Sequence, residues 1–225
     1  MPLHSVLPLP GGALLGRWHL LEPPAALWPL LADAATYLPL LPARAQGPRQ
    51  AQWLAGRVLV QHLLQAYAPT RPLPPLRNTG TGRPYLAGAG QPALSLSHGG
   101  EWVAALLAPP GTAVGIDVEV ERDKARRIQS KFLNAGELAA AHHLEAGTDP
   151  VPLYALLWSA KETLFKLAGR PGIIFRQNLL LDLPPALPGP AGTLAARLHL
   201  DGRETRHQIC YFEPAPGYVL TYCIG

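Results

Sequence analysis

The order of predicted elements nearly repeats along this 225-residue chain, and the repetition constrains the fold more than any other feature. Apolar residues at helical spacing predict one long helix over 50–67 and another over 152–168. Each helix is followed by loop and, at the end of its half, by a pair of strands, at 93–107 and 208–223. The halves show no detectable sequence similarity, so an internal duplication is a hypothesis. We therefore predict an α+β fold of two similar halves, residues 1–111 and 112–225, with a ligand-binding cleft between them.

Proline, glycine and capping residues place the remaining elements. Further strands are predicted over 14–21, 114–120, 179–183 and 194–200, and a further helix over 25–35. Asn134 followed by Glu137 is typical of a capping box, which predicts a helix that ends near residue 144. Residues 69–90 are predicted to be loop, and residues 98–101 are predicted to form the turn of the 93–107 hairpin.

Composition and charge narrow the class of protein. Hydrophobic residues make up 48% of the chain and charged residues 15%, which supports a packed core and excludes disorder. The net charge of +4 suits an anionic partner, but the basic residues are too dispersed for a nucleic-acid-binding tail. Cys210 and Cys223 lack metal-site spacing and are predicted to be free thiols. With no signal peptide and no membrane span in the sequence, we expect a cytoplasmic protein.

Two carboxylates stand in a strand that otherwise reads as buried. In the segment Gly-Ile-Asp-Val-Glu, strand alternation puts Asp117 and Glu119 on one face and Ile116 and Val118 on the other. Carboxylates held this close repel each other unless a cation lies between them, and Mg²⁺ prefers such oxygen ligands. The alternative is a solvated strand face, since Glu121 continues the row, and Asp-x-Glu by itself favours that alternative.

The second long helix carries a further carboxylate beside aromatic residues. Trp158, Glu162 and Phe165 form a stripe next to the core stripe of Leu157, Ala160, Leu164 and Leu167. Lys166 follows Glu162 by one turn, in the order that stabilises a helix. An exposed ion pair is one interpretation. The other makes Glu162 an oxygen ligand or a base and Lys166 a phosphate partner, and so predicts a magnesium site that handles a phosphate-bearing substrate.

Three weaker features add possible anion contacts. Ser97 and His98 close a strand at the hairpin, where both can donate to phosphate, although turn chemistry explains a lone Ser-His equally well. Arg83 follows a glycine-rich turn signal, and Arg49 precedes the first long helix. Arginine suits phosphate because its guanidinium binds in a bidentate manner.

Taken together, these segments resemble the 4′-phosphopantetheinyl transferases, specifically the longer, surfactin-synthetase-activating type. That family has Gly-Lys/Arg-Pro, a Ser-His hairpin, Gly-x-Asp-x-Glu and Trp-x-x-Lys-Glu-x-x-x-Lys. Here the four motifs occur in this order at residues 82–84, 97–98, 115–119 and 158–166. The resemblance runs from about residue 49 to residue 172, and four motifs in order are far more specific than any one of them. It implies a pseudo-dimer of two α+β halves with the active site between them.

The resemblance also implies a reaction and its residues. The family transfers the phosphopantetheine arm of coenzyme A to a serine of a carrier protein and releases adenosine 3′,5′-bisphosphate. By this resemblance Asp117, Glu119 and Glu162 hold Mg²⁺ (or Mn²⁺), and Asp117, Glu162 and Lys166 take part in catalysis. Coenzyme A is contacted by Arg49, Arg83, Ser97, His98 and Lys161. The partner is an acidic carrier protein, docked by analogy on an apolar stretch over 125–141, and we expect a monomer that binds neither nucleic acid nor membrane.

Two other classes of function remain as alternatives. A non-catalytic module that binds carrier protein or coenzyme A could keep the fold without the chemistry, although the presence of Asp117, Glu119, Glu162 and Lys166 argues against it. A nucleic-acid-binding protein would need clustered Lys and Arg with interleaved aromatic residues, and the sequence lacks both.

Overall fold

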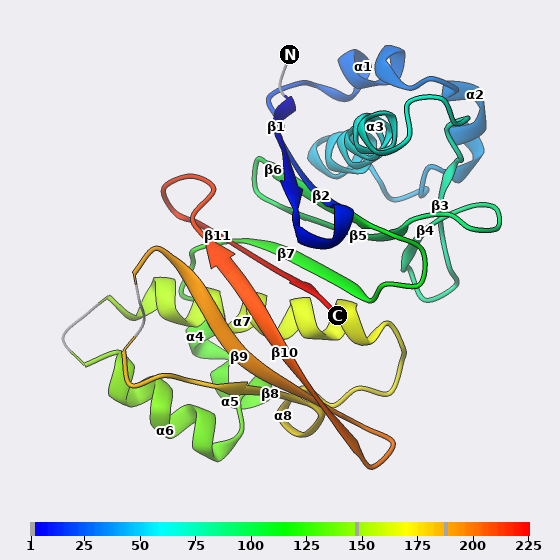
Figure 1. Cartoon of the computed structure of the whole chain (residues 1–225). Coiled ribbons are helices and arrows are strands. Elements are labelled where there is room, and N and C mark those ends of the chain that lie inside the picture. Colours follow the sequence, from blue (N-terminus) through cyan, green and yellow to red (C-terminus); the bar gives the residue numbers. More distant parts are fainter. Residues whose placement is uncertain (1–2, 147–148, 187–188) are drawn as a thin grey trace. The chain divides into compact units, whose positions relative to one another are not determined.

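The computed structural model describes residues 3–146, 149–186 and 189–225, which form two compact units, Met1–Thr112 and Ala113–Gly225 (Figure 1). Each unit has its own buried hydrophobic core. Within the described ranges, the structure has no helix of the length and apolarity needed to cross a membrane.

The first unit is an antiparallel sheet covered by one long helix (Figure 1). Its strands lie in the order β1-β2-β6-β5, and β3 pairs separately with β4. Val58 and Leu59 of the helix α3 share a core with Val103 and Leu107 of β6, and all four side chains are fully buried. The elements are β1 (Leu3–Leu9), a 3-10 turn (Pro10–Gly12), β2 (Ala13–His19), α1 (Pro24–Leu27), a 3-10 turn (Trp28–Leu30), α2 (Ala34–Tyr37), a 3-10 turn (Leu38–Leu40), α3 (Pro48–Tyr67), β3 (Leu76–Asn78), β4 (Pro84–Leu86), β5 (Ala93–Gly99) and β6 (Trp102–Ala108).

The second unit repeats this plan with a larger sheet, in the order β7-β11-β10-β9-β8. Helix α7 runs along β7 and β11, as Figure 1 shows. The elements are β7 (Val114–Val120), α4 (Lys124–Arg127), α5 (Gln129–Phe132), α6 (Ala135–Leu144), α7 (Pro150–Ala168), α8 (Phe175–Asn178), β8 (Leu179–Asp182), β9 (Ala191–Leu200), β10 (Arg203–Phe212) and β11 (Tyr218–Ile224).

The two units share a connectivity. In the first, the strand before the long helix, β2, pairs with the last strand, β6, which also pairs with β5. In the second, β7 pairs in the same way with β11, which also pairs with β10. This common core of three strands and one helix agrees with the predicted α+β fold, and it supports the duplication hypothesis at the level of topology.

Most predicted elements are present. The two long helices and the strand over 114–120 are confirmed within two residues. The capping box is also confirmed: Asn134 Oδ1 accepts from the backbone N–H of Glu137, and the Glu137 carboxylate accepts from the backbone N–H of Asn134. Gly169 ends α7 in the left-handed conformation, with φ of 65°.

Three predictions in the first unit were wrong. The single helix over 25–35 is instead α1, a 3-10 turn and α2, because Pro29 has no N–H to continue the helical ladder and Asp33 caps a new helix. The loop over 69–90 contains the β3–β4 pair. No strand was predicted over Leu3–Leu9, where β1 pairs with β2 at the edge of the sheet.

Two hairpin turns are tighter than predicted. His98 lies inside β5 opposite Val103, so the turn consists only of residues 100 and 101. In the second unit β9 and β10 are longer than predicted and are joined by Asp201 and Gly202, which both have positive φ. Asp-Gly is a strong hairpin signal. The ends of the two strands next to this turn were not predicted, because they face solvent and their charged residues do not show the alternation of a half-buried strand.

Candidate active site

The candidate site is built on the close packing of β7 against α7 in the second unit. Gly115 makes this approach possible: a Cβ atom there would lie 2.1 Å from the carbonyl oxygen of Thr163 and 3.0 Å from the backbone nitrogen of Leu167. Only glycine fits such a contact. The buried hydroxyl of Thr163 also bonds the carbonyl oxygen of Thr221 on β11 at 3.1 Å. The strand motif and the helix motif are therefore held against each other, and their charged side chains meet.

Lys166 of α7 forms an ion pair and a hydrogen bond with β7. Its Nζ donates to Asp117 Oδ1 at 2.8 Å and to the carbonyl oxygen of Ile116 at 2.9 Å. Asp117 is only 4% exposed, so its carboxylate needs this compensation in the interior. The ion pair holds the Lys166 ammonium beside the carboxylates, where it can also reach a phosphate group.

Glu119 is held by a residue whose role the sequence did not reveal. Trp158 Nε1 on α7 donates to Glu119 Oε1 at 2.9 Å. Burial raises the pKa of Glu119 and Asp117 raises it further, whereas the Trp158 hydrogen bond and the Lys166 ammonium lower it. The aromatic stripe on the helix thus orients an acid of the strand as well as flanking Glu162.

Glu162 lies in the same electrostatic cluster. Burial, followed by the Asp117 carboxylate, raises the pKa of Glu162 to about 7, although Lys166 acts to lower it. A carboxyl group with such a pKa can exchange a proton near neutral pH, as a general base must. The Lys166 ammonium acts on all three carboxylates and the Lys124 ammonium acts on Glu119 as well, so the carboxylates still outnumber the cations and the cluster favours an additional cation.

A divalent cation fits this donor set if the protein supplies only part of its coordination. Within the described ranges, no three acidic, histidine or cysteine side chains are arranged to enclose a metal ion by themselves. Mg²⁺ commonly takes one or two carboxylates and completes its shell with water and substrate phosphates. The pKa of Glu119 and that of Glu162 are both raised in part by neighbouring carboxylates, a repulsion that a cation would relieve. The residues present therefore fit Mg²⁺ bound together with a phosphate ligand.

The raised pKa of Glu162 predicts a pH-dependent stability of the metal-free protein. The folded-state pKa of about 7 exceeds the ordinary value of 4.5, so folding disfavours the ionised carboxylate. We expect wild type to lose stability relative to Glu162→Gln as pH rises from 4.5 to 7, and to show no relative loss below 4.5. Urea unfolding of both proteins at pH 4.5 and 8, in EDTA, measures this difference. A constant difference between the two proteins would contradict the raised pKa.

Lys161 does not join the cluster, and its predicted contact with coenzyme A is corrected here. Its side chain is fully buried, and its Nζ donates to Glu137 Oε1 at 2.6 Å and to the carbonyl oxygen of Leu179. Glu137 Oε1 also accepts from the backbone N–H of Leu181 at 2.7 Å. Lys161 thus connects α7 to α6 and β8 in the interior. The sequence alone could not show this, because a lysine next to Glu162 could equally have contacted the ligand.

We predict a large stability loss when this buried pair is broken. Lys161→Met leaves the Glu137 carboxylate buried without its cation, which should reduce the free energy of unfolding by about 3 kcal/mol. The double variant with Glu137→Gln should recover part of the loss, because it removes the unpaired charge. Arg127→Ala, which breaks an exposed pair with Asp123, is the control and should cost less than about 1 kcal/mol. Equal losses from the buried and the exposed variant in urea unfolding would refute the assignment.

The other predicted contacts with coenzyme A lie in the first unit. Arg49 is exposed in the first turn of α3, and Arg83 is exposed beside a hollow of about 390 Å³ that is lined by the residues following it. His98 is exposed near the end of β5, whereas Ser97 is 5% exposed. The structure gives Arg83 and His98 surface positions suited to a ligand phosphate, and it places Ser97 largely inside.

Arg57 was missed by the sequence analysis and supports the segment that carries Arg83. It is 3% exposed, and its guanidinium lies 3.3 Å from the ring centre of Trp53. Its Nη2 donates to Asn78 Oδ1 at 3.0 Å, and Asn78 Nδ2 donates to the carbonyl oxygen of Gly82 at 2.8 Å. Burial lowers the pKa of Arg57 to about 9. No motif in the sequence marks this relay, because it joins a helix to a hairpin more than twenty residues away.

Fold and site together define an α+β protein with a partly buried acid cluster and a lysine held beside it. The family model described as the 4′-phosphopantetheinyl transferase superfamily matches residues 113–223, nearly the whole second unit. The second unit of this chain is therefore similar in sequence to that superfamily. Its four principal charged residues, Asp117, Glu119, Glu162 and Lys166, all lie within the matched segment.

Curated relatives agree with this family. The chain is 36% identical over 135 residues to the 4′-phosphopantetheinyl transferase AcpT of Salmonella typhi, covering 58% of this chain and 65% of the relative. It is 33% identical over 126 residues to AcpT of Escherichia coli K12, covering 55% of this chain and 60% of the relative. The chain thus spans less than two thirds of the length of these relatives. The comparisons support the transferase family and not the surfactin-synthetase-activating type.

Proposed function

We propose that this protein transfers the 4′-phosphopantetheine arm of coenzyme A to a serine hydroxyl of an apo carrier protein. The observation that carries the proposal is the meeting of Asp117, Glu119, Glu162 and Lys166 in the unit that the superfamily model matches. The transferase activity for which the AcpT relatives are named supports the same reaction. The serine oxygen forms a bond to the phosphorus that carries pantetheine, the bond to the second phosphate breaks, and adenosine 3′,5′-bisphosphate leaves with that oxygen.

The acid cluster would hold the metal and move the proton. Asp117, Glu119 and Glu162 would bind Mg²⁺ or Mn²⁺, which neutralises charge on the pyrophosphate when bound. Glu162, directly or through a water molecule, would take the serine proton, a role that a carboxylate can fill as a general base. Lys166, held in place by Asp117 and the carbonyl oxygen of Ile116, would stabilise the transferring phosphate.

The first unit supplies the remaining phosphate contacts in this proposal. Arg83 and His98 would bind phosphates of coenzyme A, and Arg49 its 3′-phosphate. Ser97 would contribute mainly through its backbone or a small rearrangement, because its side chain is largely buried. The Arg57–Asn78–Gly82 relay would hold the Arg83 segment in position.

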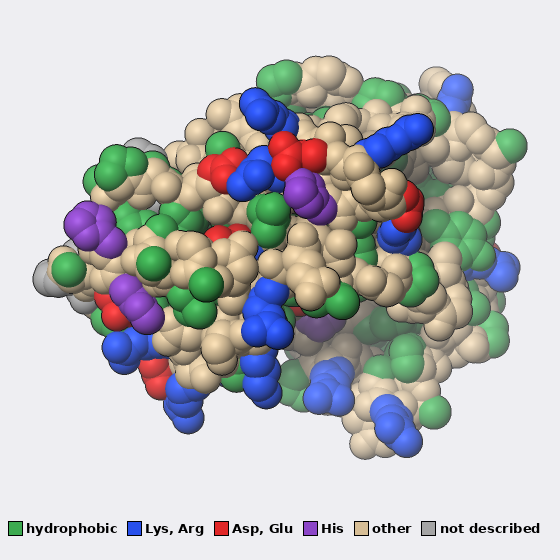
Figure 2. All heavy atoms as spheres, turned by 90° about the horizontal axis from the view of Figure 1, so that it is seen from below, with side chains coloured by type: hydrophobic (Ala, Val, Ile, Leu, Met, Phe, Trp, Pro, Cys, Tyr) green, Lys and Arg blue, Asp and Glu red, His purple; other side chains and the backbone are tan. Residues whose placement is uncertain are grey.

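The surface of α4 and α5 supports an acidic carrier protein as the second substrate. The expected docking stretch over 125–141 is not an apolar surface: Phe132, Leu133 and Ala141 are buried in it. Exposed cations lie in this stretch at positions 126, 127 and 131, and two more precede it at positions 122 and 124. Figure 2 shows separate groups of Lys and Arg on the face seen from below. Electrostatic attraction would guide an acidic partner to this surface.

Intact-mass spectrometry tests the proposed reaction. A panel of apo carrier proteins is incubated with this protein, coenzyme A and Mg²⁺, with an EDTA control. A phosphopantetheine adduct on the acceptor serine that disappears with EDTA is the expected result. If no carrier is modified, titration of coenzyme A with and without Mg²⁺ decides between a narrow acceptor range, with metal-dependent binding, and failure of the proposal, with no binding.

We predict that Asp117→Ala removes magnesium-dependent transfer. The substitution deletes a proposed metal ligand and also releases Lys166 from its ion pair. Lys166→Met is a matched variant that removes the same ion pair and keeps the carboxylate. Transfer rates measured over a Mg²⁺ titration should show no response to Mg²⁺ in the Asp117 variant and a remaining response in the Lys166 variant. An unchanged magnesium dependence in Asp117→Ala would eliminate the metal assignment.

We also propose that the protein is of the surfactin-synthetase-activating type, which the motif order favours. An internal pseudo-dimer favours a monomer, and the proposed location is the cytoplasm. Transfer to peptidyl as well as acyl carrier proteins in the mass-spectrometry panel would support that type. Light scattering of the purified protein would test the monomer.

A further inference from the structure

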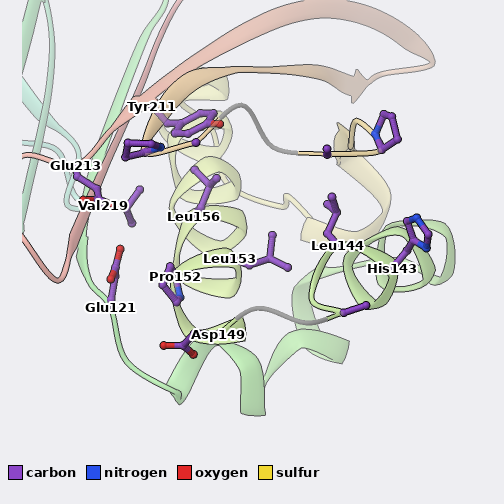
Figure 3. A pocket seen from close by; sticks show the side chains of 15 residues that line it. Glu121, His143, Leu144, Asp149, Pro152, Leu153, Leu156, Tyr211, Glu213 and Val219 are labelled. Carbon is purple, nitrogen blue, oxygen red and sulfur yellow. The ribbon is translucent and has the colours of Figure 1, made fainter.

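The second unit contains a cavity of about 460 Å³ that the proposed transfer reaction does not use (Figure 3). Its walls come from the end of α6, the first turns of α7, and the ends of β10 and β11. None of Asp117, Glu119, Glu162 and Lys166 lines it. The volume lies within the range of cavities that bind small organic molecules.

The wall nearest the core is apolar with one polar atom. Leu153, Leu156 and Val219 line it, and all three are buried. Tyr211 is 4% exposed, and its hydroxyl makes no hydrogen bond to any part of the chain that the structure describes. Figure 3 shows this hydroxyl at the cavity, above Leu156. A buried hydroxyl without a partner is unfavourable, so a ligand that offers a hydrogen bond would be stabilised here.

The rim is acidic. Glu121 follows β7, Asp149 caps α7, and Glu213 follows β10, and all three line the cavity. Figure 3 shows Glu121 and Glu213 on one side and His143 at the far end. The described lining includes neither Lys nor Arg. Carboxylates grouped without a counter-charge at the mouth of an apolar cavity attract a cation.

We propose that this cavity binds a small organic cation, with its apolar body against Leu153, Leu156 and Val219 and its ammonium or guanidinium group at the acidic rim. Tyr211 would supply a hydrogen bond to a polar atom of the ligand. The acidic rim disfavours an acidic carrier protein, which the exposed cations of α4 and α5 suit instead. The proposal does not depend on the transferase activity.

Binding of three matched probes to the full-length protein tests the charge preference. Calorimetric titrations would compare 4-phenylbutylamine, 4-phenylbutanol and 5-phenylpentanoate, which have the same phenylbutyl body and are cationic, neutral and anionic. We expect the amine to bind about tenfold more tightly than the alcohol, and the carboxylate not to bind. Equal affinity for amine and alcohol, or no binding of the amine at millimolar concentration, would overturn the proposal.

Substitutions locate the binding. Glu213→Gln removes one rim charge at an exposed position, so the variant should fold normally and bind the amine several-fold more weakly. Tyr211→Phe removes only the hydroxyl and should weaken the binding of the amine as well. Glu204→Gln removes an exposed carboxylate of the same unit that does not line the cavity, and should bind like wild type. Amine affinity that is unchanged in Glu213→Gln and Tyr211→Phe would place the binding elsewhere and refute the site.

Discussion

Glu162→Gln should reduce phosphopantetheine transfer by about a hundredfold to ten-thousandfold, while coenzyme A binding weakens much less. Glutamine keeps the size and one oxygen of the side chain but cannot take a proton from the acceptor serine. Burial, followed by the Asp117 carboxylate, raises the pKa of Glu162 in the metal-free protein, and this carboxyl is the proposed acceptor of the serine proton. Initial rates by mass spectrometry and calorimetric titration of coenzyme A measure the two effects separately.

The comparison with other acids makes this prediction specific. Glu204→Gln removes an acid of the same unit outside the cluster and should leave the transfer rate unchanged. In EDTA, Glu162→Gln should unfold at a higher urea concentration than wild type at pH 8, because the buried negative charge is gone. This result would show that the inactive variant is folded. A near-normal transfer rate in Glu162→Gln would remove Glu162 from the mechanism.

Gly115→Ala should destabilise the second unit by about 4 kcal/mol or more, a loss large enough to prevent folding. The added Cβ would lie 2.1 Å from the Thr163 carbonyl oxygen, and a backbone atom cannot rotate away as a flexible side chain can. Relief requires β7 and α7 to separate, which would disrupt the buried packing of both and pull Asp117 away from Lys166. Urea unfolding, or the fraction of soluble protein, measures the loss.

Gly136→Ala is the matched control. Gly136 lies in α6, and the nearest atom to an added Cβ, Asn134 Oδ1, is 3.4 Å away, which is an ordinary contact. Alanine in a helix is favoured over glycine by about 1 kcal/mol, so this variant should be as stable as wild type or more stable. If Gly115→Ala unfolds at the same urea concentration as Gly136→Ala, the strand and the helix are not packed as closely as the structure shows.

Local elements were predictable wherever one chain segment carries the whole signal. The capping box at Asn134 and Glu137 was recognised because both partners lie within one helical turn. The prediction of one helix over 25–35 was wrong because it relied on the apolar spacing and did not allow for Pro29, which interrupts the helix. Asp201–Gly202 was missed as a turn because solvent-exposed strands lack the alternation that marks a strand with one buried face.

The pairing of residues in the site shows the limit of local patterns. The motifs identified Asp117, Glu119, Glu162 and Lys166, but not which group contacts which. Trp158 was placed beside Glu162 on the helix, whereas its indole donates to Glu119 on the strand. That hydrogen bond joins residues 39 positions apart, and the periodicity of one element carries no information about such a distance.

The sequence by itself determined which residues are charged within apolar segments, which face of β7 and which side of α7 they occupy, and the α+β class of the fold. These follow from periods of two and 3.6 residues and from caps and breakers, all properties of neighbouring residues. Only the tertiary structure decided that Lys161 faces the interior while Lys166 faces the acid cluster. The physical reason is that each lysine goes to the carboxylate that folding brings within reach, Glu137 or Asp117, and that choice depends on how helix and sheet pack.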